Sequence, residues 1–276
     1  MQKEHPVGET LKSVQELIDE SPVVDVTDMY GQWRAALEGL LTKVTDRFEL
    51  KQDGSTKGLE VEGEIGSGVH GKVACFAGEE IDWLVYSWMA DPKSGFANLH
   101  LTINPGAQTD LPVFGMAFAN FGIRPWAYID YLPRRDLATD TDYHFKYFES
   151  GNEHWMNLRR ENPQLDWFTS PMAYIRTVVS PIAFLYSGPF EQKTTDIMIG
   201  EAHTMLDRWL GWWDDARPVP EAERPAFGQY SEDLRRTIAE LDPANGIATR
   251  LFGQETADLL VATLWGNGRE LPHAGW

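Results

Sequence analysis

The chain has 276 residues, enough for one large domain, and its 42% hydrophobic and 24% charged residues are ordinary for a globular protein. A formal net charge of −18 argues against nucleic acid as a partner, because an acidic surface repels phosphate backbones. The single cysteine, Cys75, excludes a disulfide framework and any cysteine-based zinc or iron–sulfur site.

The N-terminal residues lead into two helical patterns. Residues 1–10 lack an apolar signal region, and no run in the chain approaches the ~20 apolar residues of a membrane span, so we expect a cytoplasmic protein. Apolar residues recur at helical spacing in 9–20 and more strongly in 27–48. The sequence therefore predicts N-terminal helices within 9–48.

From about residue 59 the pattern changes to alternation of apolar and polar residues, which is typical of strands. The links between successive runs are short and rich in Gly, Pro, Asn and Asp, so the strands are expected to form an antiparallel meander. The predicted strands are 59–65, 70–77, 81–89, 97–104, 111–119 and 124–132.

Helical patterns return in the second half of the chain. The predicted helices are 140–160, 170–186, 190–214, 229–241 and 253–265. Each helical group can cover one face of the sheet. We therefore expect a single α+β domain over 1–276, an α/β/α sandwich in which a central antiparallel sheet at about 59–132 lies between N-terminal helices and C-terminal helices at about 140–265.

The run GSGVHGKV at 66–73 matches the glycine pattern of nucleotide-binding loops. A dinucleotide fingerprint needs a following helix, whereas residues 72–78 continue as a strand, and the other kinase motifs do not occur. Gly66 and Gly68 are better interpreted as a hairpin turn that needs positive φ.

The faces of the predicted sheet differ in chemistry. With the simplest hairpin registers, one face is entirely apolar and suits a helix layer. The other face is either partly solvated or the covered floor of a ligand pocket. Its residues are Trp83, Ser87, Asn98, His100, Thr102, Val113, Gly115, Ala117, Trp126, Tyr128 and Asp130.

His100 and Asp130 share that face and are the first candidates for acid–base chemistry. Burial and a nearby charge move the pKa of an imidazole or a carboxyl group into a useful range. No histidine spacing in the chain matches a metal-binding motif, so no metal site is predicted.

Three segments resemble signatures of red chlorophyll catabolite reductases, which belong to the ferredoxin-dependent bilin reductases. They are YIDYLPRRDLATDTDYHFKYFE at 128–149, FTSPMAYIRTVVSPIAFL at 168–185 and IAELDPANGIATRLFGQE at 238–255. The resemblance implies an antiparallel sheet with helices on both sides and an open-chain tetrapyrrole bound between the sheet and the C-terminal helices. It also implies electrons from ferredoxin, protons from carboxylates or histidine, and no bound flavin, nicotinamide or metal.

The chain departs from the family pattern at one position that matters for catalysis. The strand glutamate that donates a proton in the family aligns best with Ala117, which has no proton to give. A second family carboxylate corresponds to Glu240 or Asp242, and the sequence does not distinguish them. His100 and Asp130 are therefore expected to share proton handling with one of these carboxylates.

The remaining site predictions concern substrate binding. Arg176 lies in an apolar helical segment, where it pairs either with an acidic side chain or with a substrate carboxylate. Tyr143 and Tyr174 are interpreted either as core residues or as ligand contacts. The predicted binding residues are Ser87, Asn98, Thr102, Trp126, Tyr128, Tyr143, Tyr174 and Arg176.

Three functions remain open at this point. The first is a bilin-reductase-like oxidoreductase that acts on a linear tetrapyrrole or a related aromatic molecule. The second is a cofactor-independent lyase or isomerase that uses the same pocket for a phenolic aromatic compound, such as a lignin-derived dimer. The third is a non-catalytic pigment-binding protein. A homodimer is possible for each of them.

Overall fold

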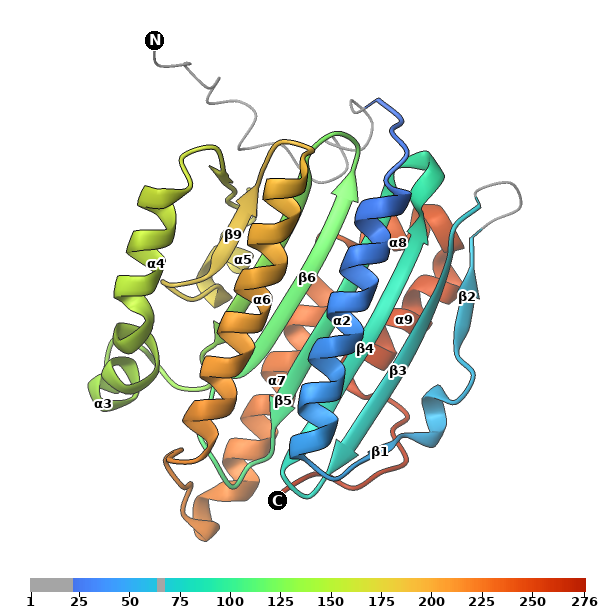
Figure 1. The fold of residues 1–276 in the computed structure, drawn as a ribbon. Helices are drawn as coiled ribbons and strands as arrows, with labels where there is room; N and C mark the ends of the chain where they lie inside the picture. The colour runs from blue at the N-terminus through green and yellow to red at the C-terminus, as the bar shows by residue number, and fades with distance from the viewer. Residues whose placement is uncertain (1–21, 64–67) are drawn as a thin grey trace.

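A large sheet lies between two layers of helices in the computed structural model, which describes residues 22–63 and 68–276 (Figure 1). Within those ranges the sheet has nine strands in the order β1-β3-β4-β5-β6-β7-β9-β8, with β2 paired to β3 outside this path. All the pairings are antiparallel. The expected α+β fold with helices on both faces of the sheet is confirmed.

The six predicted strands are confirmed, and three short strands were missed. The strands are β1 Leu50–Gln52, β2 Glu60–Glu62, β3 His70–Gly78, β4 Ile81–Asp91, β5 Phe96–Pro105, β6 Val113–Phe121, β7 Pro125–Leu132, β8 Asp166–Trp167 and β9 Phe184–Ser187. The sheet therefore extends beyond 59–132 at both ends. Gly68 has φ +70°, as a turn requires, whereas Gly66 lies outside the described residues.

The helices differ from the prediction most clearly at 170–186, where only α5 (Ala173–Val178) is helical. Pro181 disfavours helical geometry at Ser180, and the chain then forms β9, which pairs with β7. The predicted helix at 9–20 lies outside the described residues. The other helices are α2 Thr27–Arg47, α3 Thr141–His144, α4 Ser150–Glu161, α6 Gln192–Trp213, α7 Arg224–Leu241, α8 Asn245–Phe252 and α9 Gln254–Trp265. In the described ranges, none of these helices has the length and apolar character needed to cross a membrane.

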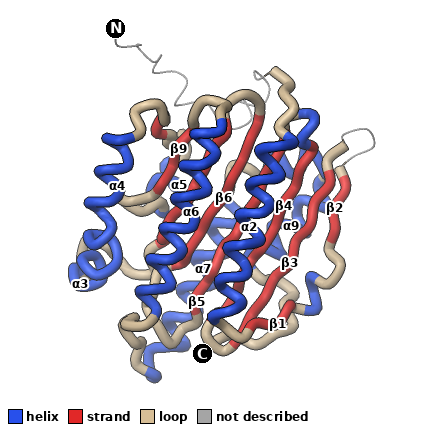
Figure 2. Tube along the Cα trace, in the orientation of Figure 1, coloured by secondary structure: helices blue, strands red, loops and turns tan. Residues whose placement is uncertain are grey.

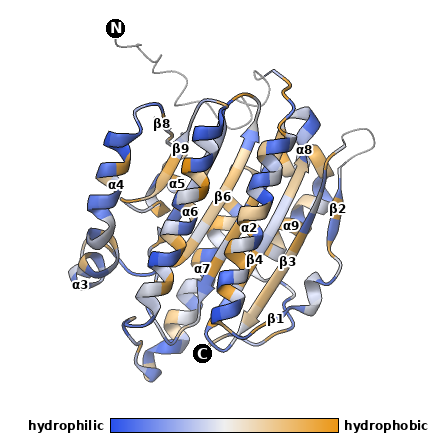
Figure 3. Cartoon of the chain, viewed as in Figure 1, coloured by the Kyte–Doolittle hydropathy of each residue, from blue (hydrophilic) through white to orange (hydrophobic). Residues whose placement is uncertain are grey.

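Helices α2 and α6 cover the apolar face of the sheet, with polar residues on their outer surfaces (Figure 3). Buried residues recur along α2 at helical spacing, and Trp33 stacks on Phe118 of β6 with 5.2 Å between ring centroids. On α6, the Trp209 indole N–H donates to the carbonyl of Pro112 at 2.8 Å. This layer forms the main hydrophobic core because long apolar side chains from both sides interdigitate.

Helices α7, α8 and α9 cover the opposite face (Figure 2). Phe252 and Leu260, at the end of α8 and on α9, pack on the apolar part of β3 and β4 around Cys75. Helix α7 differs, because the residues it buries are Gly228, Arg235 and Ala239. Apolar packing alone therefore does not explain how α7 is held against the sheet.

A buried carboxylate on β4 attaches α7 and the C-terminal segment to the sheet. Asp82 accepts from Arg235 Nη1 of α7 at 2.9 Å and from Arg269 Nη1 at 3.2 Å, and its Oδ1 lies 3.0 Å from His273 Nδ1. Although burial itself opposes ionisation, these partners hold the pKa of Asp82 far below its usual value. Arg235 also donates to the carbonyl of Trp265 at the end of α9. One carboxylate thus connects two helices and the final segment.

Replacing Asp82 by Ala is expected to lower the free energy of unfolding by about 3 to 5 kcal/mol, because it leaves two arginines buried without their counter-ion. Urea denaturation measures the loss. Asp91, at the other end of β4, makes no ion pair with any described residue, so Asp91→Ala is the matched control and is expected to change stability by less than about 1 kcal/mol. Equal losses for both variants would contradict the role given to Asp82.

Candidate functional site

The candidate site lies on the sheet face that α7, α8 and α9 cover. Direct cross-strand partners from β4 to β7 form three rows on this face, and they confirm the registers assumed from the sequence. The first row is Met89, Asn98, Ala119 and Trp126; the second is Ser87, His100, Ala117 and Tyr128; the third is Val85, Thr102, Gly115 and Asp130.

Strand β6 contributes only small side chains to the centre of these rows. Gly115, Ala117 and Ala119 lie between the larger residues of β5 and β7. Adjacent strands are about 4.8 Å apart, so His100 and Tyr128 are separated by about 10 Å across Ala117. Because these side chains are small and helix α7 buries few side chains, we infer space above the sheet at this point.

Several polar side chains around this space have no hydrogen-bond partner among the described residues. We call six residues on this face the polar floor: Ser87, Asn98, His100, Thr102, Trp126 and Tyr128. The side chains of Ser87, Asn98, His100 and Thr102 donate to and accept from no other described side chain or backbone group. The indole N–H of Trp126 is buried and also lacks a partner in the described structure. A buried, unpaired donor such as the Trp126 N–H is costly unless a ligand or water satisfies it.

We infer a recess above the polar floor from the surroundings of His100. Its side chain keeps some accessible surface. Nevertheless, burial lowers the pKa of His100 to about 4. We therefore place His100 on the wall of this inferred recess. At neutral pH the imidazole is uncharged.

Tyr128 projects over the centre of the floor. A Cβ atom placed on Gly115 would lie 3.5 Å from Tyr128 Cε1 and 3.8 Å from the hydroxyl, so the phenol extends across β6. The ring of Trp126 stacks beside it with a centroid distance of 6.4 Å and an interplanar angle of 13°. Burial, followed by the charges of Asp130 and Asp242, raises the pKa of Tyr128 well above its usual value.

Asp130 lies beneath Tyr128 and is fully buried. Its carboxylate accepts from the Ser180 N–H at 2.9 Å, from the Ser180 hydroxyl and from the Tyr131 N–H at 2.8 Å. Its Oδ2 also accepts from the Tyr128 hydroxyl at 3.3 Å. Burial raises the pKa of Asp130 to about 6, although these donors act in the opposite direction.

The structure distinguishes the two candidate carboxylates at the end of α7. Glu240 is exposed on the helix, whereas Asp242 is desolvated and its charge contributes to the raised pKa of Tyr128. Asp242 Oδ1 accepts from the Ala244 N–H at 2.7 Å. Burial raises the pKa of Asp242, so this carboxyl group holds a proton more readily than a solvated aspartate.

The sequence predicted Tyr143 and Arg176 as substrate-binding residues, but the structure places both away from the polar floor. Tyr143 is fully buried in the core on the opposite face, where its hydroxyl accepts from the Arg134 N–H at 3.0 Å. Arg176 is exposed and donates to the Ser170 carbonyl at 2.7 Å, because α5 is a short helix at the edge of the sheet and not a buried one. Tyr174 is half-buried, and its pKa is raised by burial and by Tyr230 of α7.

Ser180 is the residue of this site that sequence reasoning missed. It lies in the second Ser-Pro pair of the 168–185 segment, so the signal was present in the motif. Its contact with Asp130 spans 50 positions and depends on the pairing of β9 with β7, which was predicted as helix. The described residues also contain no cluster of His, Cys, Asp or Glu that suits a metal ion.

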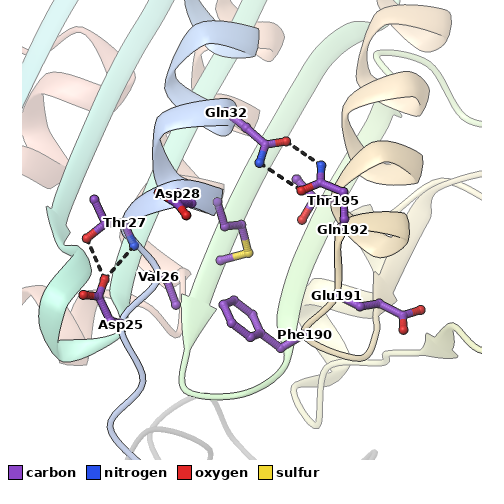
Figure 4. Close-up of a pocket in the computed structure, with 10 residues that line it drawn as sticks. Asp25, Val26, Thr27, Asp28, Gln32, Phe190, Glu191, Gln192 and Thr195 are labelled. Atoms are coloured by element: carbon purple, nitrogen blue, oxygen red, sulfur yellow. Dashed lines mark hydrogen bonds between the residues drawn. The ribbon is translucent and has the colours of Figure 1, made fainter.

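A separate pocket of about 410 Å³ lies on the other side of the sheet, between the first turns of α2 and α6 (Figure 4). Much of its polar lining is already paired. Asp25 accepts from the Thr27 N–H at 2.9 Å, and the side-chain amides of Gln32 and Gln192 bond to each other. None of the predicted site residues lines this pocket. We therefore place the candidate site at the polar floor.

A model of the red chlorophyll catabolite reductase family (RCC reductase) matches residues 65–265. The chain belongs to this family. Red chlorophyll catabolite reductase of Hordeum vulgare is 26% identical over 184 residues, which cover 63% of this chain and 89% of that protein. The chloroplastic red chlorophyll catabolite reductase 1 of Oryza sativa subsp. japonica is also 26% identical, over 68% of this chain and 60% of that protein.

The fold matches a solved structure, phytochromobilin synthase from tomato in complex with biliverdin. The TM-score is 0.73 with 16% sequence identity, over 86% of this chain and 83% of the tomato chain. At this identity the match shows the fold alone. The family match confirms the resemblance to red chlorophyll catabolite reductases stated from the sequence, and the structural match confirms the fold expected from it.

The low pKa of His100 makes stability depend on pH. Because an unfolded histidine titrates near 6.5, the folded state loses stability as the pH falls below that value towards 4. Between about pH 7 and about pH 5, wild type is expected to lose up to about 2 kcal/mol relative to His100→Gln. Urea denaturation at both pH values tests this, and an identical pH dependence of the two proteins would contradict it.

Proposed function

We propose that the protein reduces a linear tetrapyrrole, or a related ring-rich molecule, bound between the polar floor and α7. Family membership supports a reductase, and the tomato protein with the same fold was solved with biliverdin. Pyrrole nitrogens and lactam carbonyls suit the unpaired polar groups of the floor, while Trp126 and Tyr128 offer ring surfaces.

The observation that carries the proposal is the burial of Asp242 together with its electrostatic effect on Tyr128. Burial raises the pKa of this carboxyl group, which favours the protonated form that a proton donor needs. Ala117, where the family's strand glutamate was expected, provides only a methyl group between His100 and Tyr128. Proton donation therefore comes from the groups around Ala117 and not from that position.

The electrons come from outside the chain in this proposal. We expect ferredoxin, a one-electron iron–sulfur donor, to supply them, as the family resemblance implies. We also expect no resident flavin, nicotinamide or metal. The chain's own residues then bind the substrate, exclude water and supply protons to the reduced intermediates.

One observation favours a second candidate, a lyase acting on a phenolic aromatic compound. His100 is neutral, desolvated and opposite Ala117, so no carboxylate occupies the position beside it on β6. A neutral imidazole can act as a general base for a phenol, although the lowered pKa of His100 makes it a weaker base than a solvated histidine. This reaction would need no electron donor.

Substituting Asp242 by Asn is expected to lower ferredoxin-dependent turnover of biliverdin by about a hundredfold or more, while biliverdin binding stays within about threefold. Absorbance titration measures binding, and anaerobic assays with reduced ferredoxin measure turnover. Asp258→Asn, an exposed carboxylate on α9, is the control. Wild-type protein that binds no biliverdin at micromolar concentration would contradict the proposal.

Omitting the reductant separates the two reactions. Turnover of phenolic dimers without any reductant would support the lyase, and strict dependence on ferredoxin would exclude it. Tight binding of biliverdin without turnover under either condition would instead indicate a pigment-binding protein.

A further inference from the structure

Asp130 does not contact the recess directly. The residue is 0% exposed; its Oδ1 accepts from the Ser180 hydroxyl and the Tyr131 N–H, and its Oδ2 accepts from the Ser180 N–H. Its contact towards the recess is the Tyr128 hydroxyl, at 3.3 Å. A proton leaving Asp130 for a molecule on the polar floor therefore passes through Tyr128.

Tyr128 lies beside Ala117, whose methyl side chain has no proton to donate. The two residues are direct cross-strand partners on the same face. Because Gly115 has no side chain, the phenol extends over β6 and brings its hydroxyl above the strand that carries Ala117. Trp126 supports the ring from one side, which fixes its orientation.

We propose that the Tyr128 hydroxyl is the proton donor that touches the substrate, and that Asp130 is a positioning residue that acts only through it. This inference rests on the proposed function and adds a catalytic residue to it. It assigns the role of the missing strand carboxylate to a phenol on the adjacent strand.

The chemistry balances with one electron and one proton in each step. An external iron–sulfur protein gives one electron to the bound tetrapyrrole, and the resulting radical anion takes the Tyr128 hydroxyl proton. The phenol O–H bond breaks as a bond to hydrogen forms on the substrate. The phenolate then takes a proton from the carboxylic acid form of Asp130 across the 3.3 Å contact. Asp242, whose charge acts on Tyr128, returns a proton to the pair before the next electron arrives.

The test uses Tyr128→Phe, which keeps the ring over Gly115 and removes only the hydroxyl. Biliverdin is expected to bind within about threefold of wild type, while turnover falls about a hundredfold or more. The bound biliverdin absorption spectrum is also expected to shift and to change its pH dependence, because the hydroxyl contacts the pigment whether or not reduction follows.

Tyr186→Phe is the matched control. Tyr186 lies on the adjacent strand β9 but faces the opposite side of the sheet. Its hydroxyl has no partner in the described structure. Its spectrum and turnover are expected to match wild type. Adding Ala117→Glu to Tyr128→Phe restores a carboxylate beside the vacant position, and turnover is expected to recover at least about tenfold.

The outcomes separate this inference from the proposed function. If wild type binds no biliverdin, the proposed function fails and the role of Tyr128 fails with it. If wild type binds biliverdin and Tyr128→Phe gives the same bound spectrum and the same turnover, only the role of Tyr128 is overturned. Should Tyr128→Phe fail to fold, Ser180→Ala is measured instead, because loss of the Asp130 partner is expected to alter the pH profile of turnover with little change in binding.

Discussion

The recess depends on how α7 is held over the sheet. The helix buries only two small residues and one arginine, and that arginine bonds to Asp82 on β4. A helix with a conventional apolar face would have filled the space above β5 to β7 with side chains. The buried ion pair between Arg235 and Asp82 holds α7 against the sheet without large apolar side chains in that space. The position of Asp242, at the end of the same helix, follows from this attachment.

The same strands serve two purposes because successive residues point to opposite faces. On β6, Phe114, Met116 and Phe118 fill the core under α2 and α6, while the residues between them are small. On β7, Ile129 belongs to the core and Tyr128 to the site. A change at a site position therefore leaves the core packing intact. This separation allows the polar residues of the site to change while the fold is kept.

Much of this arrangement was predictable from the sequence. Alternation fixed the faces of β4 to β7, and hairpin-length links fixed their order, so His100, Tyr128 and Asp130 were correctly placed on one face. Features that depend on distant pairing were not predictable. Strand β9 has an apolar composition that also suits a helix, and its pairing with β7 is what brings Ser180 to Asp130. The burial of Tyr143 likewise depends on contacts with the core on the opposite face, which its helical spacing does not reveal.

The two helix layers are held by different forces, and this has a consequence for motion. Interdigitated apolar side chains hold α2 and α6 firmly, whereas α7 relies on a few charged contacts and buries little apolar surface. Segments with few buried apolar contacts open at lower free energy than the rest of a protein. Amide hydrogens of α7 should therefore exchange with solvent before those of α2. A bulky ligand would enter by the separation of this layer from the sheet, while the other half of the molecule stays rigid.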